Sequence, residues 1–146
     1  MNGILTLQTG TPFNLSVPGT IINAPGNSNN PDLVGTYTAS KGVGTQTTWF
    51  DPSVFRQPAA GTFGSLGRNV LTGPGLGNLD FSIFRKFAVT ERFKAEFRVE
   101  SFNVTNTAKF TNPSGDITSP NFGKVTGAQG APKGPREIQM GLKVTF

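Results

Sequence analysis

The chain has 146 residues, enough for one ordinary domain, and carries a net charge of +5. It contains no Cys and no His, which excludes disulfides, thiolate catalysis, imidazole acid–base chemistry and the usual zinc sites. Only 14% of its residues are charged, against about 25% in a typical soluble domain. We find no nucleophile–base pair, and we therefore expect no enzyme, no cofactor and no metal ion. The basic residues are interleaved with acidic ones, so nucleic acid is not an expected partner.

Residues 3–17 are predicted to form the first strand, with a bend at Pro12. Leu5 and Leu7 alternate with polar neighbours, which is the period of two that β-strands show. Pro12 has no backbone N–H to donate, so the strand is expected to bend there or to lie at a sheet edge.

Residues 18–77 show no sustained period and are rich in Gly, Pro and Asn, which predicts a long irregular loop. A connection of this length is unusual inside a compact domain. Large transmembrane barrels carry long loops on their outer side and short turns on the periplasmic side. The length of this segment therefore favours a barrel.

Residues 78–89 and 93–104 are predicted to form a β-hairpin, since both alternate with a period of two. In the second arm, every other residue is charged. We expect this charged set to face an aqueous lumen, as a salt-bridge ladder in preference to a solute path. It consists of Lys94, Glu96, Arg98 and Glu100.

The register of this hairpin is restricted because the apolar faces of its two arms must coincide. A two-residue turn would mismatch the faces, whereas a three-residue loop, Thr90–Arg92, matches them. This loop sets Lys86 opposite Glu96 and Ile83 opposite Val99. A slip by two residues would place Lys86 opposite Lys94, an unfavourable pair of like charges.

Residues 105–134 are predicted to form a second long loop, and residues 135–146 the last strand. This strand is close to the roughly 9–11 residues that cross a bilayer when tilted. Its alternating apolar residues are expected to act as a signal for the outer-membrane barrel assembly machinery, which would read them by strand pairing. The signal consists of Ile138, Met140, Leu142, Val144 and Phe146.

Two classes of protein fit this alternation. A soluble or secreted β-sandwich module for binding or adhesion would turn its apolar faces inward. A transmembrane barrel would turn them to lipid, with Phe87 and Phe93 in an aromatic girdle at the periplasmic interface and both long loops outside. We favour an all-β antiparallel meander of about four long strands, which is the C-terminal part of a transmembrane β-barrel with two long irregular loops.

Several stretches resemble the TonB-dependent outer-membrane receptors, and most closely the Oar-like branch, whose members carry a carboxypeptidase-regulatory-like N-terminal domain. The similarity lies in the order and spacing of short blocks along most of the chain. These blocks include Asn2–Phe13, Trp49–Pro52, Gly61–Gly64, Phe97–Asn103, Asn121–Gly123 and Pro135–Lys143.

The resemblance implies a 22-stranded barrel closed by a plug, and uptake of a scarce solute with energy delivered to the plug by TonB. Four strands cannot close a barrel, and no secretory signal is evident at Met1, so we expect the chain to be part of a longer parent protein in the cell outer membrane. Its expected partners are outer-membrane lipid, the assembly machinery, and the rest of the parent barrel with its plug. TonB would act only through that plug.

Overall fold

The computed structural model describes residues 1–18, 29–44, 46–128 and 134–146, which form two compact units. The sheet unit comprises Met1–Gln8, Leu76–Lys109 and Ala128–Phe146, and the loop unit comprises Thr9–Gly75 and Phe110–Gly127. No helix among the described residues is long and apolar enough to cross a membrane.

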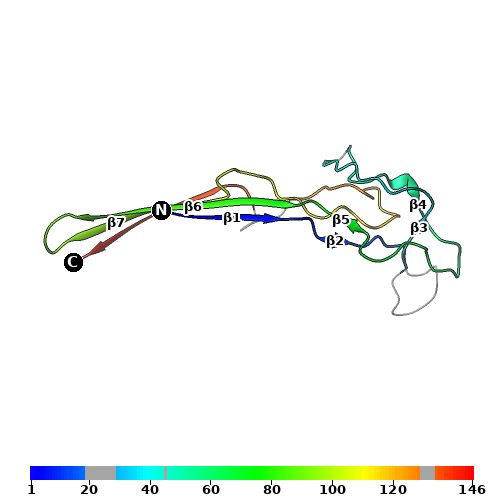
Figure 1. The fold of residues 1–146 in the computed structure, drawn as a ribbon, viewed down its shortest axis with the longest axis horizontal. Helices are drawn as coiled ribbons and strands as arrows, with labels where there is room; N and C mark the ends of the chain where they lie inside the picture. The colour runs from blue at the N-terminus through cyan, green and yellow to red at the C-terminus, as the bar shows by residue number, and fades with distance from the viewer. Residues whose placement is uncertain (19–28, 45, 129–133) are drawn as a thin grey trace. The chain divides into compact units, whose positions relative to one another are not determined.

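The sheet unit is an antiparallel meander of four strands in the order β1-β6-β7-β8. The ribbon shows β1 running alongside β6 (Figure 1). The strands are β1 (Asn2–Gln8), β6 (Leu76–Ala88), β7 (Lys94–Phe102) and β8 (Glu137–Thr145). Consecutive strands along this order are antiparallel neighbours, and β6 and β7 are joined by a tight hairpin. The predicted fold class, an all-β antiparallel meander, is confirmed.

The register between β6 and β7 agrees with the one derived from parity. Lys86 lies opposite Glu96, and Ile83 lies opposite Val99. The Val89 amide donates to the Phe93 carbonyl at 2.9 Å, which leaves Thr90–Arg92 as the three-residue loop. The alternation thus contained enough information to align the hairpin.

The first strand is shorter than predicted. The sequence suggested residues 3–17, but β1 ends at Gln8, and the chain then enters the loop unit. There β2 (Pro12–Phe13) pairs with β5 (Leu71–Thr72) in a separate two-stranded sheet. Gly10 permits this turn because a Cβ at that position would overlap the Gly73 carbonyl.

Residues 18–77 were predicted to form a long irregular loop, and the described residues among them are irregular over most of their length. They contribute to a compact unit with its own hydrophobic core. Short elements surround this core: β3 (Asp32–Leu33) pairs with β4 (Phe55–Arg56), and the 3-10 helix η1 (Pro52–Val54) precedes β4. The Asp51 carboxylate caps η1 by accepting from the Ser53 amide at 2.9 Å.

Aromatic rings dominate the core of the loop unit. Phe50 is fully buried, and its ring meets those of Phe55 and Phe122 edge-on, each with centroids 5.4 Å apart. Trp49 donates its indole N–H to the Thr72 carbonyl at 2.8 Å, which satisfies its polar group in this apolar setting. Among the described residues, this core consists of Phe13, Leu15, Trp49, Phe50, Phe55, Leu66, Leu71 and Val125.

Asn103 organises the connection from β7 to β8 in the sheet unit. It is buried, and its amide nitrogen donates to the Thr107 carbonyl at 3.0 Å and to the Gly134 carbonyl at 2.9 Å. Its side-chain oxygen accepts from the Thr107 amide at 3.0 Å. Its own backbone N–H donates to Asp80 at 2.9 Å, and its φ of 51° lies in the left-handed region that Asn tolerates. One side chain therefore ties the end of β7 to the approach to β8.

Candidate functional site on the two faces of the sheet

The registers of all three strand pairs place most of the apolar residues of the four strands on one face, which we call the apolar face. Ile4, Phe84 and Phe102 lie on the opposite face. Leu5 lies opposite Leu79, Ile83 opposite Val99, and Val99 opposite Met140. The apolar face is formed by Leu5, Leu7, Leu79, Phe81, Ile83, Phe87, Ala95, Phe97, Val99, Ile138, Met140, Leu142 and Val144. The predicted assembly residues of β8 therefore extend the apolar surface of the hairpin.

This apolar face is exposed. Met140 and Leu142 are each 69% exposed, and Leu7 is 75% exposed. The β-sandwich alternative needs a second sheet packed on these side chains, and among the described residues the only other sheets are the two-stranded ones of the loop unit. A continuous exposed apolar surface of this kind marks contact with a protein or a membrane.

The predicted interface aromatics lie at the hairpin end of the sheet. Phe87 is opposite Ala95, one pair from the end of β6, and Phe93 immediately precedes β7. The Phe93 and Phe146 rings are 6.4 Å apart between centroids. Arg85 also lies on the apolar face, and its guanidinium carbon is 5.3 Å from the Phe87 ring centroid, so the cation rests on an aromatic ring.

The opposite side of the sheet, which we call the polar face, carries the four residues predicted to face the lumen. Glu96 is paired with Lys86 at 3.6 Å and with Arg98 at 3.3 Å, and Arg98 is paired with Glu100 at 3.6 Å. Lys94 shares this face but has no ion pair among the described residues. Three of the four predicted residues therefore form a connected ionic network, to which β6 contributes Lys86. Their orientation toward a lumen stays a prediction.

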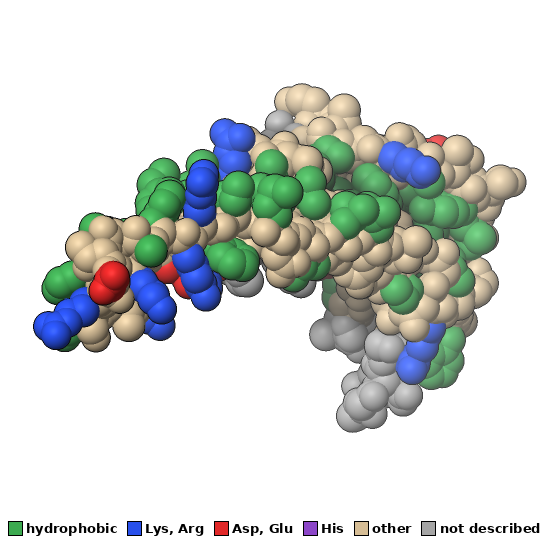
Figure 2. All heavy atoms as spheres, turned by 60° about the vertical axis from the view of Figure 1, so that its left-hand side comes forward, with side chains coloured by type: hydrophobic (Ala, Val, Ile, Leu, Met, Phe, Trp, Pro, Cys, Tyr) green, Lys and Arg blue, Asp and Glu red, His purple; other side chains and the backbone are tan. Residues whose placement is uncertain are grey.

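The polar face contains residues that the sequence analysis did not single out. Lys143 lies opposite Glu96, and Gly141 lies opposite Arg98, because β8 aligns its odd positions with the even positions of β7. Alternation in β8 predicted two faces, but the long segment between β7 and β8 left their match to β7 open. Space-filling spheres show Lys and Arg side chains gathered toward the hairpin end of the sheet (Figure 2).

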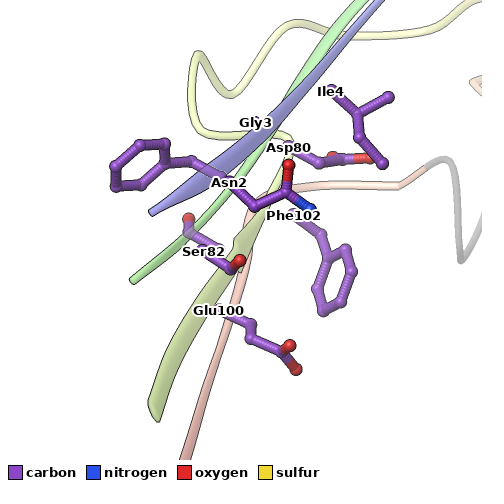
Figure 3. Close-up of a pocket in the computed structure, with 9 residues that line it drawn as sticks. Asn2, Gly3, Ile4, Asp80, Ser82, Glu100 and Phe102 are labelled. Atoms are coloured by element: carbon purple, nitrogen blue, oxygen red, sulfur yellow. The ribbon is translucent and has the colours of Figure 1, made fainter. Parts of the chain in front are cut away.

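A small hollow of about 150 Å³ lies at the other end of the polar face, where β1, β6 and β7 meet. Asp80, Ser82 and Glu100 come from neighbouring strands around it (Figure 3). Asp80 already accepts from Asn78 at 2.8 Å and from the Asn103 amide, so its role there is structural. No group of three or more potential ligands among the described residues is arranged to hold a metal ion.

Residues 1–139 match the model of the outer membrane beta barrel domain family. The chain belongs to this family. No curated protein and no solved structure matched the chain.

Membership of the outer membrane beta barrel domain family explains the two faces of the sheet. Strands of such barrels alternate between an apolar side toward lipid and a polar side toward the interior. The chain is thus part of an outer-membrane protein. The finer assignment to TonB-dependent receptors rests on the sequence resemblance.

Proposed function

We propose that the chain forms part of the barrel wall of a TonB-dependent outer-membrane receptor that takes up a scarce solute. The single observation that carries this proposal is the exposed apolar face, which is continuous over four strands and backs onto a charged face. The family match supports the barrel. The resemblance of the blocks Asn2–Phe13 and Phe97–Asn103 supports the receptor branch.

In this proposal, each surface has a distinct role. The apolar face contacts outer-membrane lipid, the polar face borders the lumen, and Phe87 and Phe93 sit at the periplasmic interface. The alternating residues of β8 serve the barrel assembly machinery. The loop unit lies on the outer side, and TonB acts only through the plug of the parent protein. The chain has no catalytic role.

The open edges of the sheet point to the rest of the parent barrel. β1 and β8 are the outermost strands, so each presents one edge without a neighbouring strand in the described structure. Lipid offers no hydrogen-bond partners to such an edge, and a membrane sheet must therefore close on itself. Because β1 and β8 run antiparallel to each other, an even number of additional antiparallel strands would close the ring.

Adjacent positions in β8 allow a direct test of which face meets lipid. Leu142 lies on the apolar face and Gly141 on the polar face, and a Cβ at Gly141 meets nothing within 4 Å. In the intact parent protein, Leu142→Arg should lower the yield of folded barrel in the outer membrane, since an arginine on the lipid side costs roughly 2–4 kcal/mol near the midplane. Gly141→Arg is the matched control: it places an arginine opposite Arg98 on the polar face, a repulsion that costs about 1 kcal/mol or less, so the yield should fall less than with Leu142→Arg.

The yield is measured as heat-modifiable protein in outer-membrane fractions. Equal loss in both variants, or a larger loss with Gly141→Arg, would contradict the proposed orientation.

The proposed coupling of uptake to TonB is tested by growth under limitation of one nutrient at a time. Deleting the parent protein should impair growth in a strain with TonB and have no additional effect in a strain without it. An additive defect would refute coupling to TonB.

A further inference from the structure

The charges on the polar face are separated along the strands. Its hairpin half carries Lys86, Lys94, Arg98 and Lys143 around one acid, Glu96. Its other half carries the acids Asp80, Glu100 and Glu137 and, among the residues of the four strands, no Lys or Arg. An anion approaching this face is therefore attracted to the hairpin half and repelled from the other half.

The single acid in the basic half is already neutralised. Lys86, Glu96 and Lys143 lie in one row across β6, β7 and β8. Glu96 is paired with Lys86 at 3.6 Å and with Arg98 at 3.3 Å. Lys94 and Lys143 have no ion pair among the described residues. The ammonium groups of Lys94 and Lys143 thus remain available to a ligand. Lys86 also lies in this half, and it shares its only ion-pair partner, Glu96, with Arg98.

These groups surround a real hollow. A cavity of about 360 Å³ is lined by Lys86, Lys94, Glu96, Lys143 and Thr145, together with Phe87, Ala88 and Ala95. Its volume lies within the range of roughly 300–1,000 Å³ that small-molecule sites occupy. Lys ammonium groups and the Thr145 hydroxyl are donors, so the lining offers mainly donors to a ligand.

We propose that this cavity binds a small multivalent anion bearing phosphate or carboxylate groups. An anion between Lys94 and Lys143 relieves the repulsion of like charges on neighbouring strands. Ammonium groups bind phosphate as point charges without strict geometric demands, which suits flexible lysines around an open hollow. A monovalent anion would leave one of the two free lysines unpaired. The placement of this site inside a barrel rests on the proposed function, whereas binding of the anion does not.

Lysine acylation measured by mass spectrometry tests the site in the intact protein that carries this chain, purified in detergent. Pyrophosphate should slow the acylation of Lys94 and Lys143 by about tenfold at saturation, as expected when their ammonium groups pair with the anion. Exposed Lys41, in the loop unit, is the internal control and should react at an unchanged rate. Sodium chloride at matched ionic strength separates binding from screening.

A second arm with citrate distinguishes a phosphate from a carboxylate preference, and protection by either anion supports the site. Lys143→Gln should weaken the protection of Lys94 by about tenfold in anion concentration, while Lys41→Gln should not change it. Equal protection of Lys41, or none at Lys94 and Lys143, overturns the proposal. Because this readout requires neither uptake nor TonB, its failure is distinguishable from failure of the receptor function.

Discussion

Lys86 faces Glu96 across β6 and β7, with 3.6 Å between its Nζ and a carboxylate oxygen. The Lys86 side chain is 73% exposed, so this pair contributes little free energy to the isolated sheet. Its value lies in specificity, because the nearest alternative register would place Lys86 opposite another lysine and raise the energy of the misaligned hairpin. The ion pair therefore selects one alignment of the two apolar faces.

Cysteine pairs can test this alignment, since the chain has no Cys of its own. The double variant Ile83→Cys/Val99→Cys joins directly opposite residues and should oxidise readily. Opposite Cα atoms in antiparallel strands are about 4.5–5.5 Å apart, within the range that a disulfide spans. Ile83→Cys/Phe97→Cys would become opposite only after a slip by two residues, so it should cross-link much more slowly. Non-reducing electrophoresis of the folded protein measures both, and faster cross-linking of the second pair would refute the observed register.

Asn103 is expected to be the most sensitive polar residue of the sheet unit. Asn103→Ala removes three hydrogen bonds to Thr107 and Gly134 and places Ala at a positive φ. We expect a loss of roughly 2–4 kcal/mol in the free energy of unfolding. Asn103→Gly tolerates the backbone but lacks the hydrogen bonds, and should recover only part of the loss. Denaturant unfolding of the folded protein measures both, and a neutral Asn103→Ala would contradict this role.

Gly64 packs closely against the backbone of the loop unit, so its substitution should destabilise that unit. A Cβ at Gly64 would overlap the Asn30 carbonyl, so Gly64→Ala requires the backbone to move. We expect a loss of about 2 kcal/mol or more. Gly67→Ala is the matched control, because its Cβ would meet only a methyl of exposed Val70, at 3.3 Å, and should change stability by less than about 0.5 kcal/mol. Fluorescence of Trp49, the one Trp of the chain, reports unfolding of the loop unit.

Two turn aspartates should make the loop unit sensitive to acid. The Ser53 hydroxyl, followed by the Ser53 amide, lowers the pKa of Asp51 below its ordinary value of 3.8. Thr118 lowers the pKa of Asp116 in the same way. A carboxyl whose pKa is lowered in the folded state contributes stability above pH 3.8 and loses it as the pH falls through the folded pKa.

The Trp49 unfolding midpoint of the wild type should therefore fall as the pH decreases below 3.8. The double variant Asp51→Asn/Asp116→Asn keeps a side-chain acceptor in each turn and cannot be protonated in this range, so part of the decrease should disappear. An identical pH profile in the variant and the wild type would show that these turns do not cause the acid sensitivity.

Deletion of Phe146 tests the proposed assembly signal. In the intact parent protein, we expect a lower amount of assembled barrel, because Phe146 directly follows β8 and continues its alternation, and its loss also removes the ring contact to Phe93. Phe63→Ala is the control, since Phe63 is also exposed but belongs to the loop unit. Outer-membrane yield is compared at equal synthesis. An unchanged yield after the deletion would refute a signal at this residue.

The sheet was predictable because its residues obey one local rule. Alternation in 93–104 defined both faces, and parity with 78–89 left one register free of facing lysines. The two faces of the last strand were equally clear. Its register against β7 was not, because a long connection does not fix which residues of the two strands lie opposite each other. Lys143 was therefore not recognised as a neighbour of Glu96.

The loop unit was not predictable by the same rule. Its core combines residues from distant segments without a shared period, such as Phe13, Phe50 and Val125. Gly- and Pro-rich composition predicted irregular backbone correctly, but irregular backbone can still enclose a core when aromatic side chains converge. Only three-dimensional contacts reveal that convergence.

The loop unit draws its core from two stretches of chain, with β6 and β7 encoded between them. Val125 and the Phe122 ring come from the later stretch, so a nascent chain that has emerged only as far as the hairpin lacks part of that core. Such non-local closure slows folding, since loop-closure entropy is lost before the contacts form. Maturation of the loop unit should therefore follow synthesis of the hairpin, and a chain truncated before residue 110 should leave an unfinished apolar surface for proteases to attack.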